Sequence, residues 1–279
     1  MILVDFTAIF KKELKTQFEE NELRNHIVIL YDFYLGLDRT QTVLNGHIEV
    51  DEQDALKLLS ALAELKNHKP IDYIINQSVF YGREFYVDKS VLIPRSETEE
   101  LVQWILEEEI AGDGIILDIG SGSGCIPITL DLEGKFEAVD ALEISTDANV
   151  TARKNAVNLG AKVTFEDLDI LTQIPKRHYD VVVSNPPYVR EEELEGLDKN
   201  VVEYEPTIAL APKGDPLTFY KRMIAIAPQI LKNGGRLYWE IHEDLGKEIV
   251  VLLNNGPFSD IELREDLYGR DRLVKATFH

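Results

Sequence analysis

Two stretches of the sequence combine residue types that could do chemistry. In the first, "VVVSNPPYV" (residues 181–189), apolar residues are followed by Asn185, two prolines and Tyr188. The β-branched run predicts a buried strand, and Asn-Pro and Pro-Pro predict a rigid turn at its end. Such a turn alone would explain the pattern. An amide and an aromatic ring fixed at a strand end could also hold a planar ligand.

The second stretch is "IILDIGSGSGCIPITL" (residues 115–130), in which a buried strand runs to Asp118 and a glycine-rich loop leads into a helix. Glycines let the backbone pass close beneath a ligand at the carboxyl end of a strand, where doubly wound folds bind their cofactors. The dinucleotide fingerprint needs two residues between its second and third glycines, and that position after Gly122 is Cys125. NAD is therefore disfavoured. The predicted cofactor loop consists of Gly120, Ser121, Gly122, Ser123 and Gly124.

An acidic residue ends the next predicted strand, "FEAVDALE". Glu143 stands at about the place where this class of fold holds ribose hydroxyls. Asp140 is the alternative, although its side chain and that of Glu143 should point to opposite faces of the strand. We expect Glu143 to bind the cofactor.

Strands alternate with helices after Pro94, which predicts an α/β fold with a mainly parallel sheet. A helix is expected over 145–159, ending at Gly160, and an antiparallel pair of strands after residue 257 should close the sheet. Ser96 and Glu99 form the pattern of a capping box. The expected strands are 114–119, 136–143, 162–166, 179–184 and 235–241.

The region before Pro94 has a different pattern. Residues 1–75 carry helical periodicity, including a helix capped by Asp51 with Ala55, Leu58, Leu59, Leu62 and Leu65 on one face. Residues 79–93 predict a two-stranded ribbon that turns at residues 88–90. The expected division is a helical recognition domain over 1–75, a β-ribbon connector over 76–94 and a catalytic domain over 95–279.

Composition excludes several classes of function. The chain of 279 residues has a net charge of −21, which disfavours tight non-specific binding to nucleic acids. Its single cysteine excludes an internal disulfide, and its six histidines show no metal-ligand spacing, so no metal is expected. No apolar run reaches transmembrane length and no signal peptide is recognisable, so we expect a cytoplasmic protein without membrane contact.

Together these motifs resemble a known family. Asp-x-Gly-x-Gly-x-Gly, the acidic strand end and Asn-Pro-Pro-Tyr are similar to class I S-adenosylmethionine-dependent methyltransferases that modify amino groups. The segments "VLIPRSETEELV", "YEPTIAL", "LKNGGRLYWEI" and "DLYGRDRLV" narrow the resemblance to the PrmC/HemK family, the glutamine methyltransferases of peptide chain release factors. The resemblance implies a Rossmann-like, seven-stranded, mostly parallel sheet, S-adenosylmethionine as cofactor and a release factor as partner. The expected target is the glutamine of its Gly-Gly-Gln loop.

The resemblance also gives the first stretch a chemical role. The Asn185 side-chain oxygen and the Pro186 carbonyl would each accept one N–H of the substrate amide and hold its nitrogen for methyl transfer. Pro187 would stiffen the loop, and Tyr188 would offer its face to the amide. Asn185 is also expected beside the cofactor. By carry-over from the family, Asp169 and Ile170 would lie at the adenine, where Ile170 departs from a tryptophan that can occupy this position.

Other functions remain open at this stage. A glutamine methyltransferase of a ribosomal protein would share every motif. Nucleic-acid methyltransferases that act on adenine N6 or guanine N2 share the Asn-Pro-Pro-aromatic loop, but they need a basic surface and this chain is acidic. A non-catalytic scaffold would not need the intact loop, and an NAD-dependent dehydrogenase is disfavoured by the glycine spacing.

Overall fold

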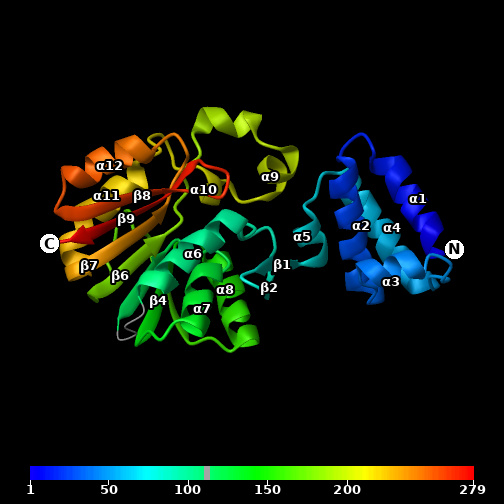
Figure 1. Cartoon of the computed structure of the whole chain (residues 1–279), viewed down its shortest axis with the longest axis horizontal. Coiled ribbons are helices and arrows are strands. Elements are labelled where there is room, and N and C mark those ends of the chain that lie inside the picture. The colour runs from blue at the N-terminus through cyan, green and yellow to red at the C-terminus, as the bar shows by residue number, and fades with distance from the viewer. Residues whose placement is uncertain (110–113) are drawn as a thin grey trace. The chain divides into compact units, whose positions relative to one another are not determined.

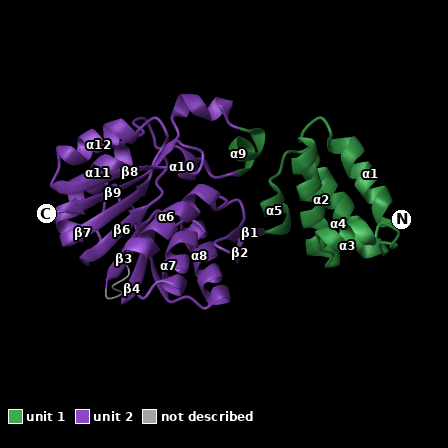
Figure 2. Ribbon diagram, viewed as in Figure 1, with its two compact units in different colours: residues 1–76, 198–204 green, residues 77–197, 205–279 purple. Residues whose placement is uncertain are grey.

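The computed structural model describes residues 1–109 and 114–279, which form two compact units (Figures 1 and 2). Residues 1–76 and the short segment 198–204 make up the amino-terminal unit. Residues 77–197 and 205–279 make up the carboxy-terminal unit. Among the described residues, no helix combines the length and apolarity needed to cross a bilayer.

The amino-terminal unit is helical and has its own apolar core. Asp51 caps α4 by accepting a hydrogen bond from the Asp54 backbone N–H at 2.9 Å, as predicted. Leu59 is 41% exposed, so its assignment to the buried face is wrong; Leu58, Leu62 and Leu65 already fill that stripe at helical spacing. The helices are α1 (Leu3–Leu14), α2 (Glu20–Leu35), α3 (Arg39–Leu44), α4 (Glu52–Lys66), α5 (Ile71–Ile75) and α9 (Lys199–Tyr204).

The carboxy-terminal unit begins with the ribbon formed by β1 (Gln77–Phe80) and β2 (Arg83–Tyr86). Its turn lies at Tyr81 and Gly82, not at residues 88–90 as predicted. Both turn residues have positive φ angles, 50° and 72°, which suit the twist of a two-residue hairpin. The expected Asp88–Ser90 turn exists, with Asp88 accepting from the Ser90 N–H at 2.9 Å, but it follows the ribbon.

A seven-stranded sheet forms the centre of this unit, with the order β5-β4-β3-β6-β7-β9-β8 (Figure 1). The first five strands in that order run parallel, and β9 lies antiparallel between β7 and β8. This confirms the predicted mostly parallel sheet and its closing antiparallel pair. The strands are β3 (Ile115–Ile119), β4 (Ala138–Glu143), β5 (Val163–Asp167), β6 (Tyr179–Ser184), β7 (Leu231–Glu240), β8 (Phe258–Glu265) and β9 (Asp271–Phe278).

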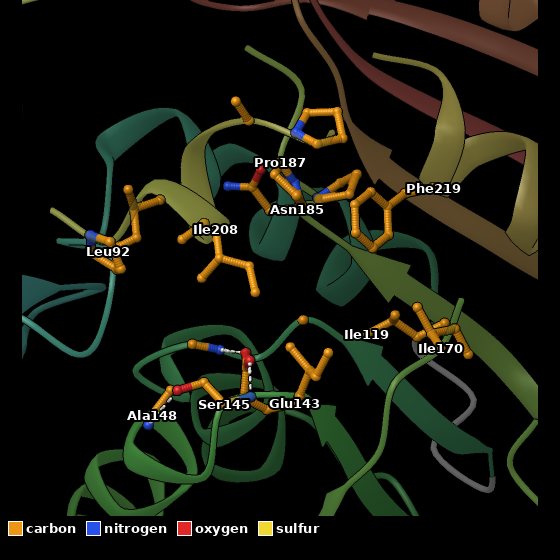
Figure 3. Close-up of a pocket in the computed structure, with 18 of the residues that line it drawn as sticks. Leu92, Ile119, Glu143, Ser145, Ala148, Ile170, Asn185, Pro187, Ile208 and Phe219 are labelled. Carbon is orange, nitrogen blue, oxygen red and sulfur yellow. Dashed lines mark hydrogen bonds between the residues drawn. The ribbon is translucent and has the colours of Figure 1, made fainter. Parts of the chain in front are cut away.

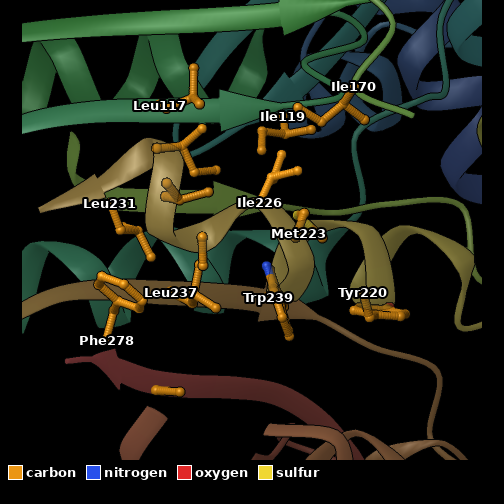
Figure 4. Packing of buried hydrophobic residues seen from close by; sticks show 14 of the residues in the cluster. Leu117, Ile119, Ile170, Tyr220, Met223, Ile226, Leu231, Leu237, Trp239 and Phe278 are labelled. Atoms are coloured by element: carbon orange, nitrogen blue, oxygen red, sulfur yellow. The ribbon is translucent and has the colours of Figure 1, made fainter. Parts of the chain in front are cut away.

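Helices cover both faces of the sheet. On one face, α6 (Ser96–Glu108), α7 (Cys125–Glu133) and α8 (Thr146–Leu159) pack on the strands. On the other face, α11 (Thr218–Ile230) and α12 (Gly246–Asn254) enclose an apolar core in which Leu237 and Trp239 lie among α11 side chains (Figure 4). Two layers of buried apolar contacts therefore fix the strand ends in place.

The predicted capping box of α6 is wrong. Arg95 is the residue before the helix, Ser96 is the first helical residue, and the Ser96 hydroxyl donates to Glu97. Glu99 instead accepts the Tyr81 backbone N–H of the ribbon turn at 2.8 Å. The acidic side chain thus joins the start of α6 to the ribbon.

Candidate functional site

A cavity of about 800 Å³ opens at the carboxyl ends of β3, β4 and β6 (Figure 3). Within the sheet, β3 lies between β4 and β6. The strand order therefore runs in one direction from β3 to β4 and β5, and in the opposite direction from β3 to β6 and β7. Parallel sheets bind ligands where the strand order reverses in this way. All residues that line the cavity belong to the carboxy-terminal unit.

The glycine-rich loop contributes its first two glycines to the cavity. Gly120 and Gly122 line it and have φ angles of 80° and 52°. A Cβ built on either glycine would meet nothing within 4 Å, so their backbone faces open space. This arrangement leaves room for a ligand close above the loop.

The other loop residues predicted to bind the cofactor lie behind the cavity wall. Ser121 and Ser123 are buried, and the backbone carbonyl of Ser123 accepts the side-chain N–H of Asn155 at 2.9 Å. A Cβ on Gly124 would lie 2.9 Å from Ile128 and 3.2 Å from Ala152. These residues set the close approach of the loop to α7 and α8, and none of the three lines the cavity.

Glu143 lies at the edge of the cavity, as predicted from its position at the end of β4. One carboxylate oxygen accepts the Gly122 N–H at 3.0 Å and the other accepts the Ser145 N–H at 2.9 Å (Figure 3). Each oxygen keeps a lone pair for a further donor, such as a ribose hydroxyl. Asp140 does not line the cavity and instead accepts a hydrogen bond from Tyr179 at 3.2 Å.

Asp169 and Ile170 both line the cavity beyond β5. Ile170 is 5% exposed and belongs to the apolar core beside Leu142. The Asp169 carboxylate accepts the Leu171 N–H at 2.9 Å and the Thr172 hydroxyl at 3.0 Å. Asp169 therefore stabilises its own turn.

Asn185, Pro186 and Pro187 line the cavity directly after β6 (Figure 3). The Asn185 amide donates through Nδ2 to the Thr98 hydroxyl at 3.1 Å. Tyr188 is not among the lining residues: its hydroxyl donates to Glu240 at 2.9 Å, and its ring contacts that of His242 edge-on. Tyr188 therefore contacts Glu240 and His242 and does not line the cavity.

Sequence reasoning missed two polar residues next to this loop. Thr98 and Glu240 are 3% and 1% exposed and are joined by a hydrogen bond of 2.6 Å. Both lie within segments that suggested the family, "PRSETEE" and "RLYWEI". The available signal was a carboxylate directly after Leu237, Tyr238 and Trp239, because buried charges need specific partners.

A second carboxylate links two segments around the cavity. Glu205 is 4% exposed, accepts from Arg95 at 2.6 Å and accepts the Ile93 N–H at 3.2 Å. The next residue, Pro206, lines the cavity, followed by Ile208 from α10 (Thr207–Leu210). Arg95 therefore binds the carboxylate next to Pro206 and helps to fix this part of the cavity wall.

The residues present fit S-adenosylmethionine. Gly120 and Gly122 leave an open cradle, Glu143 offers acceptors for hydroxyls, and Ile170 and Phe219 supply apolar walls for a ring. Cys125 does not provide a nucleophile, because burial raises the pKa of its thiol to about 12. The chemistry at this site therefore depends on positioning by polar acceptors rather than on a protein nucleophile.

The sequence matches two family models and several curated relatives. Residues 97–215 match the Methyltransferase small domain, and residues 10–75 match the PrmC N-terminal domain. A release factor glutamine methyltransferase from Flavobacterium psychrophilum is 40% identical, with 100% of both chains covered. One from Bacteroides thetaiotaomicron is 36% identical and covers 97% of this chain and 98% of its own.

Solved structures show the same fold at low sequence identity. A methyltransferase from Pyrococcus furiosus covers 82% of this chain and 98% of its own, with 17% identity and a TM-score of 0.53. A T. thermophilus 16S rRNA methyltransferase, solved with AdoMet and guanosine, covers 73% of this chain and 50% of its own, with 15% identity and a TM-score of 0.51. These likenesses concern the fold.

Proposed function

This chain belongs to the release factor glutamine methyltransferase family, and from that premise we infer which residues perform the transfer and which partner they act on. The enzyme transfers a methyl group from S-adenosylmethionine to the side-chain amide nitrogen of a glutamine. We propose that this glutamine belongs to the Gly-Gly-Gln loop of a peptide chain release factor. Asn185 at the cavity is the observation that carries the proposal.

A glutamine side-chain nitrogen is a poor nucleophile because its lone pair is delocalised into the carbonyl. S-adenosylmethionine supplies a methyl group already activated by its sulfonium. The protein must therefore orient the amide. Asn185 Oδ1 and the Pro186 carbonyl accept no hydrogen bond from the described residues, so both are available for the two N–H groups. Positioning of this kind can supply roughly 7–11 kcal/mol of a barrier.

The same two acceptors stabilise the positive charge that develops on the nitrogen during attack. Glu143 and Ile170 both line the cavity, where Glu143 would hold the ribose hydroxyls and Ile170 would pack against the adenine. The Asp169 carboxylate oxygens already accept two hydrogen bonds within their turn, and their remaining lone pairs would accept the adenine amine. Tyr188 supports the loop from behind through its bond to Glu240.

The amino-terminal unit serves recognition of the folded partner. Residues 10–75 match a domain that carries the family name, and no group of this unit lines the cavity. The net charge of −21 favours a protein substrate over direct contact with a nucleic-acid backbone.

Methyl transfer from isotope-labelled S-adenosylmethionine to purified release factor, followed by mass spectrometry, tests this function. The label should map to the glutamine nitrogen of the Gly-Gly-Gln loop. It should be lost when that glutamine is replaced by glutamate. Labelling of a ribosomal protein or of RNA in place of the release factor would overturn the assignment.

A further inference from the structure

A chain of buried polar groups lies behind the Asn-Pro-Pro-Tyr loop. Glu240, at the end of β7, accepts the Thr98 hydroxyl through one carboxylate oxygen at 2.6 Å and the Tyr188 hydroxyl through the other at 2.9 Å. Thr98 in turn receives the Asn185 side-chain N–H at 3.1 Å. Segments from α6, the loop after β6 and β7 thus meet in one hydrogen-bonded path.

The path has a fixed direction. A threonine hydroxyl has one proton, and here that proton goes to Glu240, so the Thr98 oxygen remains an acceptor. It therefore pairs with the NH₂ end of Asn185 and disfavours the carbonyl end. Oδ1 and Nδ2 are the two branches of one planar amide. Because Nδ2 is bound to Thr98, Oδ1 remains available to accept a hydrogen bond.

The hydrogen bonds of Glu240 support this direction. Burial raises the pKa of its carboxyl, while the Thr98 and Tyr188 hydroxyls and the nearby Arg272 favour the ionised form. The pKa of the Tyr188 hydroxyl is raised well above its usual value by burial and by Glu240, so this hydroxyl stays protonated and donates. Each of the two Glu240 oxygens accepts one hydroxyl hydrogen bond, from Thr98 and from Tyr188.

We propose that Thr98, oriented by Glu240, is a positioning residue that fixes the Asn185 amide with its oxygen available to the substrate. The inference rests on the proposed role of Asn185 as an acceptor for the substrate amide. Thr98 acts through Asn185 and touches neither the cofactor nor the reacting atoms. If the Asn185 amide turned over, its NH₂ would face the substrate N–H groups, and two donors would oppose each other.

Thr98→Val tests the proposal, because valine keeps the shape of threonine and removes the hydroxyl, whereas Thr98→Ser keeps the hydroxyl. Thr98→Val should lower kcat on release factor by at least about tenfold, the scale of a small misplacement of a reacting group. The Thr98→Ser variant should retain most of the activity. The KM for release factor and the affinity for S-adenosylmethionine should stay close to those of the unaltered chain in both variants. The Tm should fall in Thr98→Val, because that variant removes a hydrogen-bond donor from the buried Glu240 carboxyl.

A double variant separates this role from a general structural one. Since Thr98 acts through Asn185, adding Thr98→Val to Asn185→Ala should lower kcat little further than Asn185→Ala alone. Equal kcat values for Thr98→Val and Thr98→Ser would overturn the proposal. So would a double variant in which the two losses multiply.

Side-chain amide exchange gives a readout that does not need methyl transfer. The NH₂ resonances of Asn185, assigned by their loss in Asn185→Ala, should exchange slowly in the full chain and in Thr98→Ser, and faster in Thr98→Val. Unchanged exchange in Thr98→Val would contradict the positioning role. If the exchange pattern holds but release factor is not methylated by the unaltered chain, the proposed function fails and the positioning inference stands.

Discussion

Asp118, the next-to-last residue of the central strand β3, has a fully buried side chain. Neither of its oxygens has a hydrogen-bond partner among the described residues. Burial raises the pKa of Asp118 well above its usual value, and the negative charge of Glu143 raises it further. The folded, cofactor-free protein therefore holds the Asp118 proton to a higher pH than the unfolded chain does.

Asp118→Asn should stabilise the cofactor-free protein in a pH-dependent way. Above the usual aspartate pKa of about 4, the unfolded chain ionises while the folded chain holds its proton, so stability falls as pH rises through the raised folded pKa. Asparagine removes this titration. Its Tm should exceed that of the unaltered protein by at least about 2 °C at pH 8, and by less near pH 5.

Thermal unfolding followed by circular dichroism at several pH values measures this difference. Asp140→Asn is the matched control, because Asp140 lies one strand away and is paired with Arg177 at 3.3 Å. It should show no such gain in Tm. A gain from Asp118→Asn that shrinks as pH rises would contradict the account.

At the scale of elements, the strands and helices of the carboxy-terminal unit follow from the sequence because their apolar periods are strong. The strand predicted over 179–184 and the helix over 145–159 agree with β6 and α8 to within one residue. The ribbon turn was misplaced because Asp88 and Ser90 form a real turn close to the one at Tyr81. A positive φ angle in a tyrosine has no sequence signal.

Residues of the candidate site could be predicted from the sequence only where they belong to one contiguous motif. Gly120 and Gly122 of the glycine loop and Asn185 each belong to a contiguous pattern, and these three residues line the same cavity. Thr98 and Glu240 meet Asn185 through tertiary packing from distant segments. Hydrogen-bond partners of that kind depend on how α6, β6 and β7 pack together, which no contiguous motif specifies.

The glycine loop gives a prediction at this scale. Gly124→Ala and Gly160→Ala both place a Cβ at a positive φ angle, 81° and 77°. That strain costs about 1–2 kcal/mol in each. Only at Gly124 would the Cβ also crowd Ile128 and Ala152, which adds about 1–3 kcal/mol. Urea unfolding should therefore show a larger loss for Gly124→Ala, together with weaker S-adenosylmethionine binding. Equal losses in the two variants would contradict the packing role of Gly124.

At the scale of the whole molecule, the chain divides into a unit that contains the cavity and a helical unit that does not. The helical unit also includes residues 198–204, where the Tyr204 hydroxyl donates to the Asn67 carbonyl at 2.7 Å. Two segments far apart in the sequence therefore build one unit. Removing residues 1–75 would therefore remove most of the residues with which segment 198–204 forms this unit.

Deletion of residues 1–75 should leave S-adenosylmethionine binding nearly unchanged and greatly reduce methylation of intact release factor. The physical reason is that a specific protein interface requires several hundred Å² of surface on each partner, which the cavity of the other unit does not supply alone. A short Gly-Gly-Gln peptide, which needs only the cavity, should lose far less activity. Calorimetry and methyl transfer to both substrates measure this; full activity on the intact protein would refute the division of labour.

The measurement that tests the central claim most directly is the single-turnover rate of Asn185→Ala at saturating S-adenosylmethionine. The Asn185 acceptor matters most as charge develops on the nitrogen, so the variant should lose turnover by about 100-fold or more. The dissociation constant for release factor, measured separately, should change by only a few-fold. A rate within a few-fold of the unaltered enzyme, or a loss confined to release factor binding, would contradict the account.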